Sequence, residues 1–187
     1  MSQKHVYIIH GYSASPEAHW FPWLKQKLID TGVQVSVLAM PTPTSPDHIA
    51  WLEHLNEHIQ SPNENTFFVA HSLGCITLLH YLNSLSKQIK IGGVILVSGF
   101  ISPLSILPAL DPFTKDDFNP AHIMSLSENR VVIASRDDSI VPYVQTKELS
   151  QLLNMPLLEI EKGGHFLASD GFTKFPIVYE ILQKMLC

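Results

Sequence analysis

Apolar residues follow two patterns that alternate along the chain. In one, they form short continuous runs, which are typical of parallel strands covered on both faces. In the other, they recur about every three or four positions, as they do on one face of a helix. The continuous runs occupy residues 5–9, 33–38, 66–70, 93–97, 130–135 and 156–160. They predict a mainly parallel sheet of about six strands.

The helical pattern lies between most of the predicted strands. It covers Trp20 to Leu28, Ile49 to Ile59, residues 73–86, the stretch after Pro142 and the segment from about Pro176 to Leu186. Strands that alternate with helices favour a doubly wound α/β fold, with right-handed crossovers and helices on both faces of the sheet. At 187 residues, the chain suits a single domain over residues 1–187.

Residues 98–121 break this alternation. They contain four prolines, Pro103, Pro108, Pro112 and Pro120, and no clear hydrophobic period. A long irregular insert in a compact domain is often a functional loop. We therefore expect a short lid at about 98–121, with an inert surface loop as the alternative.

Composition and charge narrow the classes of function. The chain is 45% hydrophobic and 16% charged, which argues against disorder. Its net charge of −5, without any run of Lys and Arg, excludes nucleic acid as an expected partner. Two cysteines, Cys75 and Cys187, indicate no disulfide framework. Ser, Gly and Pro interrupt the apolar region from Val94 to Leu110, so we expect no membrane span and a cytoplasmic location.

The segment Ala70-His71-Ser72-Leu73-Gly74 joins a predicted strand directly to a predicted helix. A sharp turn at such a junction exposes a nucleophilic serine, and small residues two before and two after it let strand and helix pack closely. The usual form is Gly-x-Ser-x-Gly, and here Ala70 stands at the first glycine. Ser72 is the predicted nucleophile, and His71 should point away from the pocket as a structural residue.

A nucleophilic serine needs a base to take its proton and an acid to orient that base. With this type of turn the chain order is Ser, then Asp or Glu, then His. Asp137 and Asp138 follow the strand predicted at 130–135, and beyond them His165 is the only histidine. His165 is therefore the predicted base. Either aspartate can be the acid, whereas Asp111, Asp116 and Asp117 of the proline-rich segment are less favoured.

The oxyanion of a tetrahedral intermediate needs backbone N–H donors. One predicted donor is the N–H of Leu73, directly after the serine, and the other is the N–H of Tyr12 in the loop after the first strand. Gly11 would allow a tight backbone path there. We expect His10 and Gly11 to contribute to substrate binding, and Trp20 to line the pocket, with a core position as the alternative for Trp20.

Two histidines four residues apart, His54 and His58, fall on one face of a predicted helix. That spacing can bind a metal ion, but the His-Glu-x-x-His signature of zinc enzymes is absent. A solvated helix face explains the pair better. We expect no metal and no cofactor.

With these residues in place, the chain resembles the α/β-hydrolase superfamily, and within it the small YdeN-like serine hydrolases related to retinoblastoma-binding protein nine. The resemblance rests on His10-Gly11-Tyr12, His19-Trp20, the segment around Ser72, Asp137-Asp138 and Gly163-Gly164-His165-Phe166. It implies a triad of Ser72, Asp138 and His165, and esterase-like activity on small acyl esters.

The sequence features are compared with three possible functions. The favoured one is a serine hydrolase that cleaves small acyl esters through an acyl-enzyme. The alternative is a protein-interaction module that keeps the hydrolase fold and binds a protein partner. A flavodoxin-like nucleotide binder has little support, because no Gly-x-Gly-x-x-Gly or phosphate loop follows any predicted strand.

Overall fold

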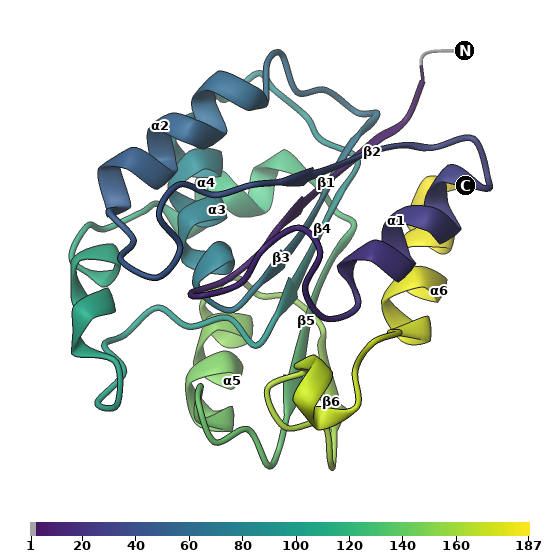
Figure 1. The fold of residues 1–187 in the computed structure, drawn as a ribbon. Coiled ribbons are helices and arrows are strands. Elements are labelled where there is room, and N and C mark those ends of the chain that lie inside the picture. Colours follow the sequence, from purple (N-terminus) through teal and green to yellow (C-terminus); the bar gives the residue numbers. More distant parts are fainter. Residues whose placement is uncertain (1–2) are drawn as a thin grey trace.

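The structure, a computed structural model, describes residues 3–187 and is built around a six-stranded parallel sheet (Figure 1). The strand order is β2-β1-β3-β4-β5-β6, and every neighbouring pair is parallel. The strands are β1 (His5–Ile9), β2 (Gln34–Leu38), β3 (Thr66–His71), β4 (Gly93–Val97), β5 (Arg130–Ser135) and β6 (Leu157–Ile160). Each lies within one residue of its predicted bounds, so the predicted sheet is confirmed.

Helices cover both faces of this sheet, as the alternating pattern predicts (Figure 1). On one face lie α1 (Phe21–Ile29) and α6 (Pro176–Leu186). The other face carries α2 (His48–His58), α3 (Leu73–Ser84), α4 (Pro120–Leu126) and α5 (Tyr143–Leu152). Along β1 the side chains alternate between the two cores, with Val6 and Ile8 on the α1 side and Tyr7 and Ile9 on the other.

Two 3₁₀ helices and α4 are not predicted by the hydrophobic pattern. They are η1 (Pro108–Thr114), η2 (Ala168–Asp170) and α4, which begins after the capping side chain of Asn119. The expectation of an irregular segment at 98–121 is therefore wrong over η1 and the start of α4. Short helices that begin at a proline contain too few turns for a period to show.

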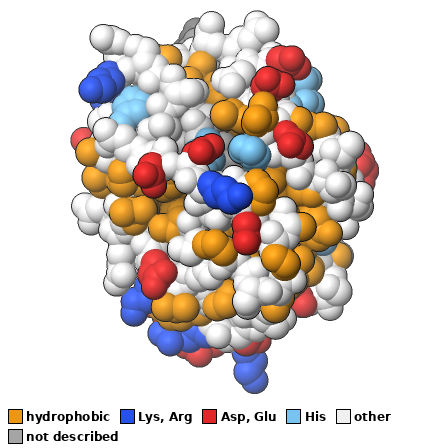
Figure 2. Space-filling view, turned by 90° about the vertical axis from the view of Figure 1, so that its left-hand side faces the viewer, with side chains coloured by type: hydrophobic (Ala, Val, Ile, Leu, Met, Phe, Trp, Pro, Cys, Tyr) orange, Lys and Arg blue, Asp and Glu red, His pale blue; other side chains and the backbone are white. Residues whose placement is uncertain are grey.

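Because all six strands are parallel, their carboxyl ends meet at one edge of the sheet, where ligands of such folds bind. The loops after β1, β3, β4, β5 and β6 converge there (Figure 1). Within residues 3–187, none of the helices is long and apolar enough to cross a membrane. On the face shown in Figure 2, Lys and Arg side chains lie scattered among acidic and apolar ones rather than in a stripe.

Candidate active site

Ser72 occupies a strained turn between β3 and α3. Its backbone has φ 55° and ψ −124°, a region that side-chain-bearing residues rarely adopt. The N–H of Ser72 donates to the carbonyl oxygen of Val97 on the neighbouring strand, at 2.9 Å. This bond ties the turn to the end of β4 and helps to hold the serine in its strained conformation.

Gly74 explains how α3 can start so close to the sheet. A Cβ atom at this position would lie 2.6 Å from the carbonyl oxygens of Ile9 and His10 at the end of β1, closer than any side chain can approach. Ala70 stands where the usual motif has glycine. It is fully buried in the core beneath the turn, paired with Ile9 on β1 and Leu96 on β4. The packing beneath Ser72 therefore accommodates the extra methyl group.

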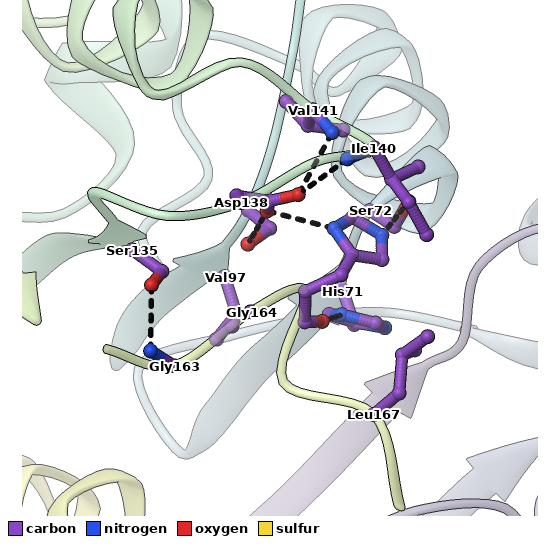
Figure 3. Close-up of polar contacts among 12 residues, drawn as sticks. His71, Ser72, Val97, Ser135, Asp138, Ile140, Val141, Gly163, Gly164 and Leu167 are labelled. Atoms are coloured by element: carbon purple, nitrogen blue, oxygen red, sulfur yellow. Dashed lines mark hydrogen bonds and ion pairs between the residues drawn. The ribbon is translucent and has the colours of Figure 1, made fainter. Parts of the chain in front are cut away.

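The side chains of Ser72, His165 and Asp138 form a continuous hydrogen-bonded chain (Figure 3). The Oγ of Ser72 lies 2.9 Å from Nε2 of His165, and Nδ1 of His165 lies 2.8 Å from Oδ2 of Asp138. All three side chains are buried. Because a carboxylate only accepts, Nδ1 carries the imidazole proton and Nε2 is left to accept the serine hydroxyl. The structure thus brings together three residues that are far apart in the sequence.

Asp138 is held from both of its oxygens. Oδ1 accepts the N–H groups of Ile140 and Val141, both at 2.9 Å, and Oδ2 accepts the hydroxyl of Ser98 at 2.8 Å as well as the proton of His165. These bonds leave the carboxylate one orientation, in which it faces the imidazole (Figure 3).

Asp137, the other aspartate that the sequence left open, has a separate role. Its Oδ1 accepts the hydroxyl of Ser135 at 2.6 Å and the N–H groups of Gly163 and Gly164 at 2.9 and 2.8 Å. These hydrogen bonds, with that of Ser135 the largest contribution, lower the pKa of Asp137 to about 2. The side chain joins the loop after β5 to the loop that carries His165, and makes no contact with the imidazole.

The loop that carries His165 is anchored at several further points. Oδ2 of Asp170 accepts the N–H groups of His165 and Leu167, at 2.9 and 3.1 Å. Nε2 of His71 lies 2.8 Å from the carbonyl oxygen of His165. Burial lowers the pKa of His71 well below its ordinary value, so its ring is neutral and donates through Nε2. His71 does not line the cavity beside Ser72, in agreement with its predicted structural role.

The two predicted oxyanion donors belong to the residue after Ser72 and to the loop that follows β1. The N–H of Leu73 belongs to the first residue of α3, where helix N–H groups have no partner within the helix. The loop that carries Tyr12 passes directly against the serine, because a Cβ atom on Gly11 would lie 2.8 Å from Cβ of Ser72. Gly11 is therefore required for this close approach, and no larger residue fits.

His10 lies behind this loop and orients it. Its Nε2 accepts the N–H of Met40 at 3.2 Å, so Nδ1 carries the proton and donates to the carbonyl oxygen of Gly11 at 2.9 Å. In a trans peptide the C=O and N–H groups point in opposite directions. Holding the carbonyl of Gly11 therefore also fixes the direction of the N–H of Tyr12.

A cavity of about 340 Å³ opens over Ser72 and His165. It is lined by Tyr12, Ser13, His19, Ser72, Ile106, Leu107, Ile140, His165 and Leu167. Two larger hollows, of about 690 and 540 Å³, lie at the opposite edge of the sheet and are lined by none of Ser72, Asp138 and His165. We assign the smaller cavity as the candidate site because it alone among these three contains the serine.

None of the three predicted substrate-binding residues, His10, Gly11 and Trp20, lines this cavity, although Gly11 lies directly against Ser72. His10 is buried behind the loop, as described above. Trp20 is fully buried in the core, where its ring packs against Phe21, His71 and Phe175, so its predicted pocket position is wrong. His19 lines the cavity instead, and its backbone adopts φ 53°. The sequence alone does not indicate which of these two adjacent side chains lines the cavity.

His54 and His58 stack on the exposed side of α2, with ring centroids 3.9 Å apart. Nδ1 of His58 lies 2.8 Å from the carbonyl oxygen of His54. Over residues 3–187, no group of three or more His, Cys, Asp or Glu side chains is placed to hold a metal ion.

An open parallel sheet with a strained serine at the turn after β3 defines the α/β-hydrolase class. The chain belongs to the serine hydrolase family, whose model matches residues 6–184. It is 48% identical to YdeN of Bacillus subtilis over 97% of its own length and 95% of the relative. The crystal structure of the ydeN gene product superposes with a TM-score of 0.95 at 47% identity, covering 98% of both chains.

More distant proteins are similar to this chain in sequence or in fold. Serine hydrolase RBBP9 of Rattus norvegicus is 22% identical, over 89% of this chain and 88% of the relative. Est1E of Butyrivibrio proteoclasticus superposes with a TM-score of 0.73 at 14% identity, covering 99% of this chain and 89% of that one. The recognition of a YdeN-like hydrolase from sequence is thus confirmed.

Proposed function

We propose that this serine hydrolase is a carboxylesterase that cleaves small acyl esters through a covalent acyl-enzyme on Ser72. The observation that carries the proposal is the hydrogen-bonded chain from Ser72 through His165 to Asp138, at 2.9 and 2.8 Å. A serine hydroxyl is a weak nucleophile until a neighbouring base takes its proton. Here the base is in contact with the hydroxyl, and its second nitrogen is held by a carboxylate.

In the first half of the reaction, Oγ of Ser72 attacks the acyl carbonyl carbon while its proton passes to Nε2 of His165. The N–H groups of Tyr12 and Leu73 donate hydrogen bonds to the developing oxyanion, an interaction worth about 10²–10³ in rate for each donor. As the carbonyl reforms, the ester bond breaks and the alkoxide leaves with the proton from His165. Asp138 stabilises the imidazolium that exists between these transfers.

In the second half, water replaces the alcohol. His165 takes a proton from the water, the resulting hydroxide attacks the acyl carbon, and Ser72 leaves with that proton as the free acid forms. Ile106, Leu107, Ile140 and Leu167 would face the acyl or alcohol group with apolar surface. A cavity of about 340 Å³ is at the small end of ligand sites, which favours small substrates.

We also propose that residues 98–121 form a short cover over the site within a single domain. Ile106 and Leu107 line the cavity, whereas Leu110 and Phe113 of η1 are buried in the core and anchor the segment. Ile106 itself is 59% exposed, so the segment would cover the cavity only in part.

A fluorophosphonate probe tests the proposal, since it reacts only with an activated serine. Wild-type protein should be labelled at Ser72 and should hydrolyse 4-nitrophenyl acetate, and Ser72→Ala should do neither. Folded wild-type protein that takes up no label, or a Ser72→Ala variant with an unchanged rate of hydrolysis, would contradict the proposal. If Ser72→Ala lost hydrolysis but still bound a protein partner as wild type does, the protein-interaction role would be favoured instead.

A further inference from the structure

The lining of the cavity divides into two chemical halves. Its polar side chains other than Ser72 and His165 all come from the segment between β1 and α1, and its apolar side chains come from three later loops. The polar ones are Tyr12, Ser13 and His19, and the apolar ones are Ile106, Leu107, Ile140 and Leu167. Hydrolysis of a simple ester uses only the triad and two backbone N–H groups. The polar half is therefore available for another part of the substrate.

His19 is the member of this half whose hydrogen-bonding state is determined. Its Nδ1 accepts the N–H of Ala168 at 3.0 Å, so the proton of the neutral ring is on Nε2. Burial, followed by the repulsion that a protonated His165 would exert, lowers the pKa of His19 below its ordinary value, which keeps the ring neutral at pH 7. Asp170 acts in the opposite direction with a smaller effect. Within residues 3–187, Nε2 of His19 has no hydrogen-bond partner.

His19 is held in place through its ring and through its backbone. The bond from Ala168 fixes its Nδ1 edge, and the fully buried Trp20 anchors the backbone immediately after it. The backbone itself adopts φ 53°, in the left-handed region. Residues in such conformations are concentrated at functional sites, where the surrounding packing over-determines them. His19 is thus a positioned donor beside the nucleophile.

We propose that His19 binds substrate by donating a hydrogen bond from Nε2 to an oxygen other than that of the reacting carbonyl. The inference rests on the proposed esterase function and narrows its substrates. They are small esters that carry a second acceptor oxygen, as an ether, hydroxyl or keto group, in the acyl or the alcohol part. The remaining carbon atoms face Ile106 and Ile140.

Two pairs of nearly isosteric esters test this. In the first, 4-nitrophenyl methoxyacetate is compared with 4-nitrophenyl butyrate, and in the second, 2-methoxyethyl acetate is compared with butyl acetate. Within each pair one oxygen replaces one CH₂ group. The ratio of kcat/KM within a pair, divided by the same ratio for wild type, cancels the intrinsic reactivity of the esters and any general loss of activity.

The informative variant is His19→Asn, whose side-chain oxygen can still accept the N–H of Ala168 but whose NH₂ group lies one bond closer to the backbone than Nε2 and does not take the place of that donor. His19→Phe loses both, and His58→Asn removes an exposed histidine of α2 as a matched control. We expect His19→Asn and His19→Phe to lower the oxygen-to-CH₂ ratio about 3- to 10-fold in at least one pair, as for the loss of one hydrogen bond. His58→Asn should leave both ratios unchanged.

Unchanged ratios in His19→Asn for both pairs would overturn the inference, and a loss confined to His19→Phe would assign His19 only the support of Ala168. In both cases wild-type hydrolysis and labelling of Ser72 would persist, and the proposed function would stand. Wild-type protein that hydrolyses none of the four esters and takes up no label would overturn both. Equal thermal midpoints of the variants would exclude misfolding as the cause of a changed ratio.

Discussion

Nε2 of His71 lies 2.8 Å from the backbone carbonyl oxygen of His165 and donates a hydrogen bond to it. The residue directly before the serine therefore holds the backbone of the residue that faces the serine. His71 belongs to the end of β3 and His165 to the loop after β6, so this bond joins the ends of two strands that are not neighbours in the sheet. The bond connects two segments that are far apart in the sequence and meet only in the folded chain.

Replacement of His71 by phenylalanine should reduce both stability and activity. The variant leaves the buried carbonyl of His165 without its donor, which costs about 1–3 kcal/mol of unfolding free energy. A displaced imidazole should also lower kcat by about 10- to 100-fold, because small errors of position are costly in catalysis. Urea denaturation and ester hydrolysis measure the two effects.

His122 offers a matched control. It is also buried, its Nε2 lies 2.9 Å from the carbonyl oxygen of Leu85, and, as in His71, its Nδ1 has no partner within residues 3–187. His122→Phe should lose a similar free energy of unfolding but keep its kcat. An equal loss of kcat in both variants would show that the effect of His71 is general destabilisation.

The stability of the protein should fall as the pH drops below about 6.5. Burial lowers the folded-state pKa of both His71 and His10 below the unfolded value of 6.5. Below pH 6.5 the unfolded chain therefore binds protons that the folded chain does not, which favours unfolding by up to about 1.4 kcal/mol per pH unit for each histidine. Above pH 6.5 both states are neutral and the effect vanishes.

His71→Phe should flatten this dependence between pH 6 and pH 5, because the contribution of His71 is removed. Urea denaturation of wild type and variant at pH 7, 6 and 5 measures the difference in slope. Parallel curves for the two proteins over this range would mean that His71 is not held neutral by the fold.

The two adjacent aspartates should respond differently to the same substitution. Asp138→Asn replaces one of the two oxygens by an NH₂ group. The one oxygen that remains cannot accept both from His165 and from the N–H groups of Ile140 and Val141. The wrong tautomer of His165 then faces Ser72, and kcat should fall by about 10⁴-fold. Asp137→Asn keeps an acceptor for Gly163 and should lose less than about 10-fold. Steady-state hydrolysis compares the two, and a larger loss at Asp137 would reverse the assignment.

Gly74→Ala should distort the turn at Ser72. The added Cβ would lie 2.6 Å from two backbone carbonyl oxygens of β1, and such overpacking typically costs about 1–3 kcal/mol. The start of α3 must shift, so labelling of Ser72 by a fluorophosphonate should slow markedly. Ala70→Gly, which restores the usual motif, should also destabilise the core by about 1 kcal/mol but leave labelling fast. Similar labelling rates in the two variants would contradict this account.

The sequence by itself determined the sheet, five of the helices and the pairing of Ser72 with His165. Apolar periodicity is a local property, and the six runs ended within one residue of the strands. Ser72 was recognisable because its turn is encoded in consecutive residues. His165 followed from chain order, since it is the only histidine after Asp138.

Only the tertiary structure decided which of two adjacent residues enters the site. Asp138 rather than Asp137 faces His165, and His19 rather than Trp20 lines the cavity. Neighbouring side chains diverge according to backbone dihedrals, such as φ 53° at His19, and according to the hydrogen bonds that distant loops supply. Those hydrogen-bond partners come from the ends of other strands, so they cannot be predicted from composition or from spacing along the sequence.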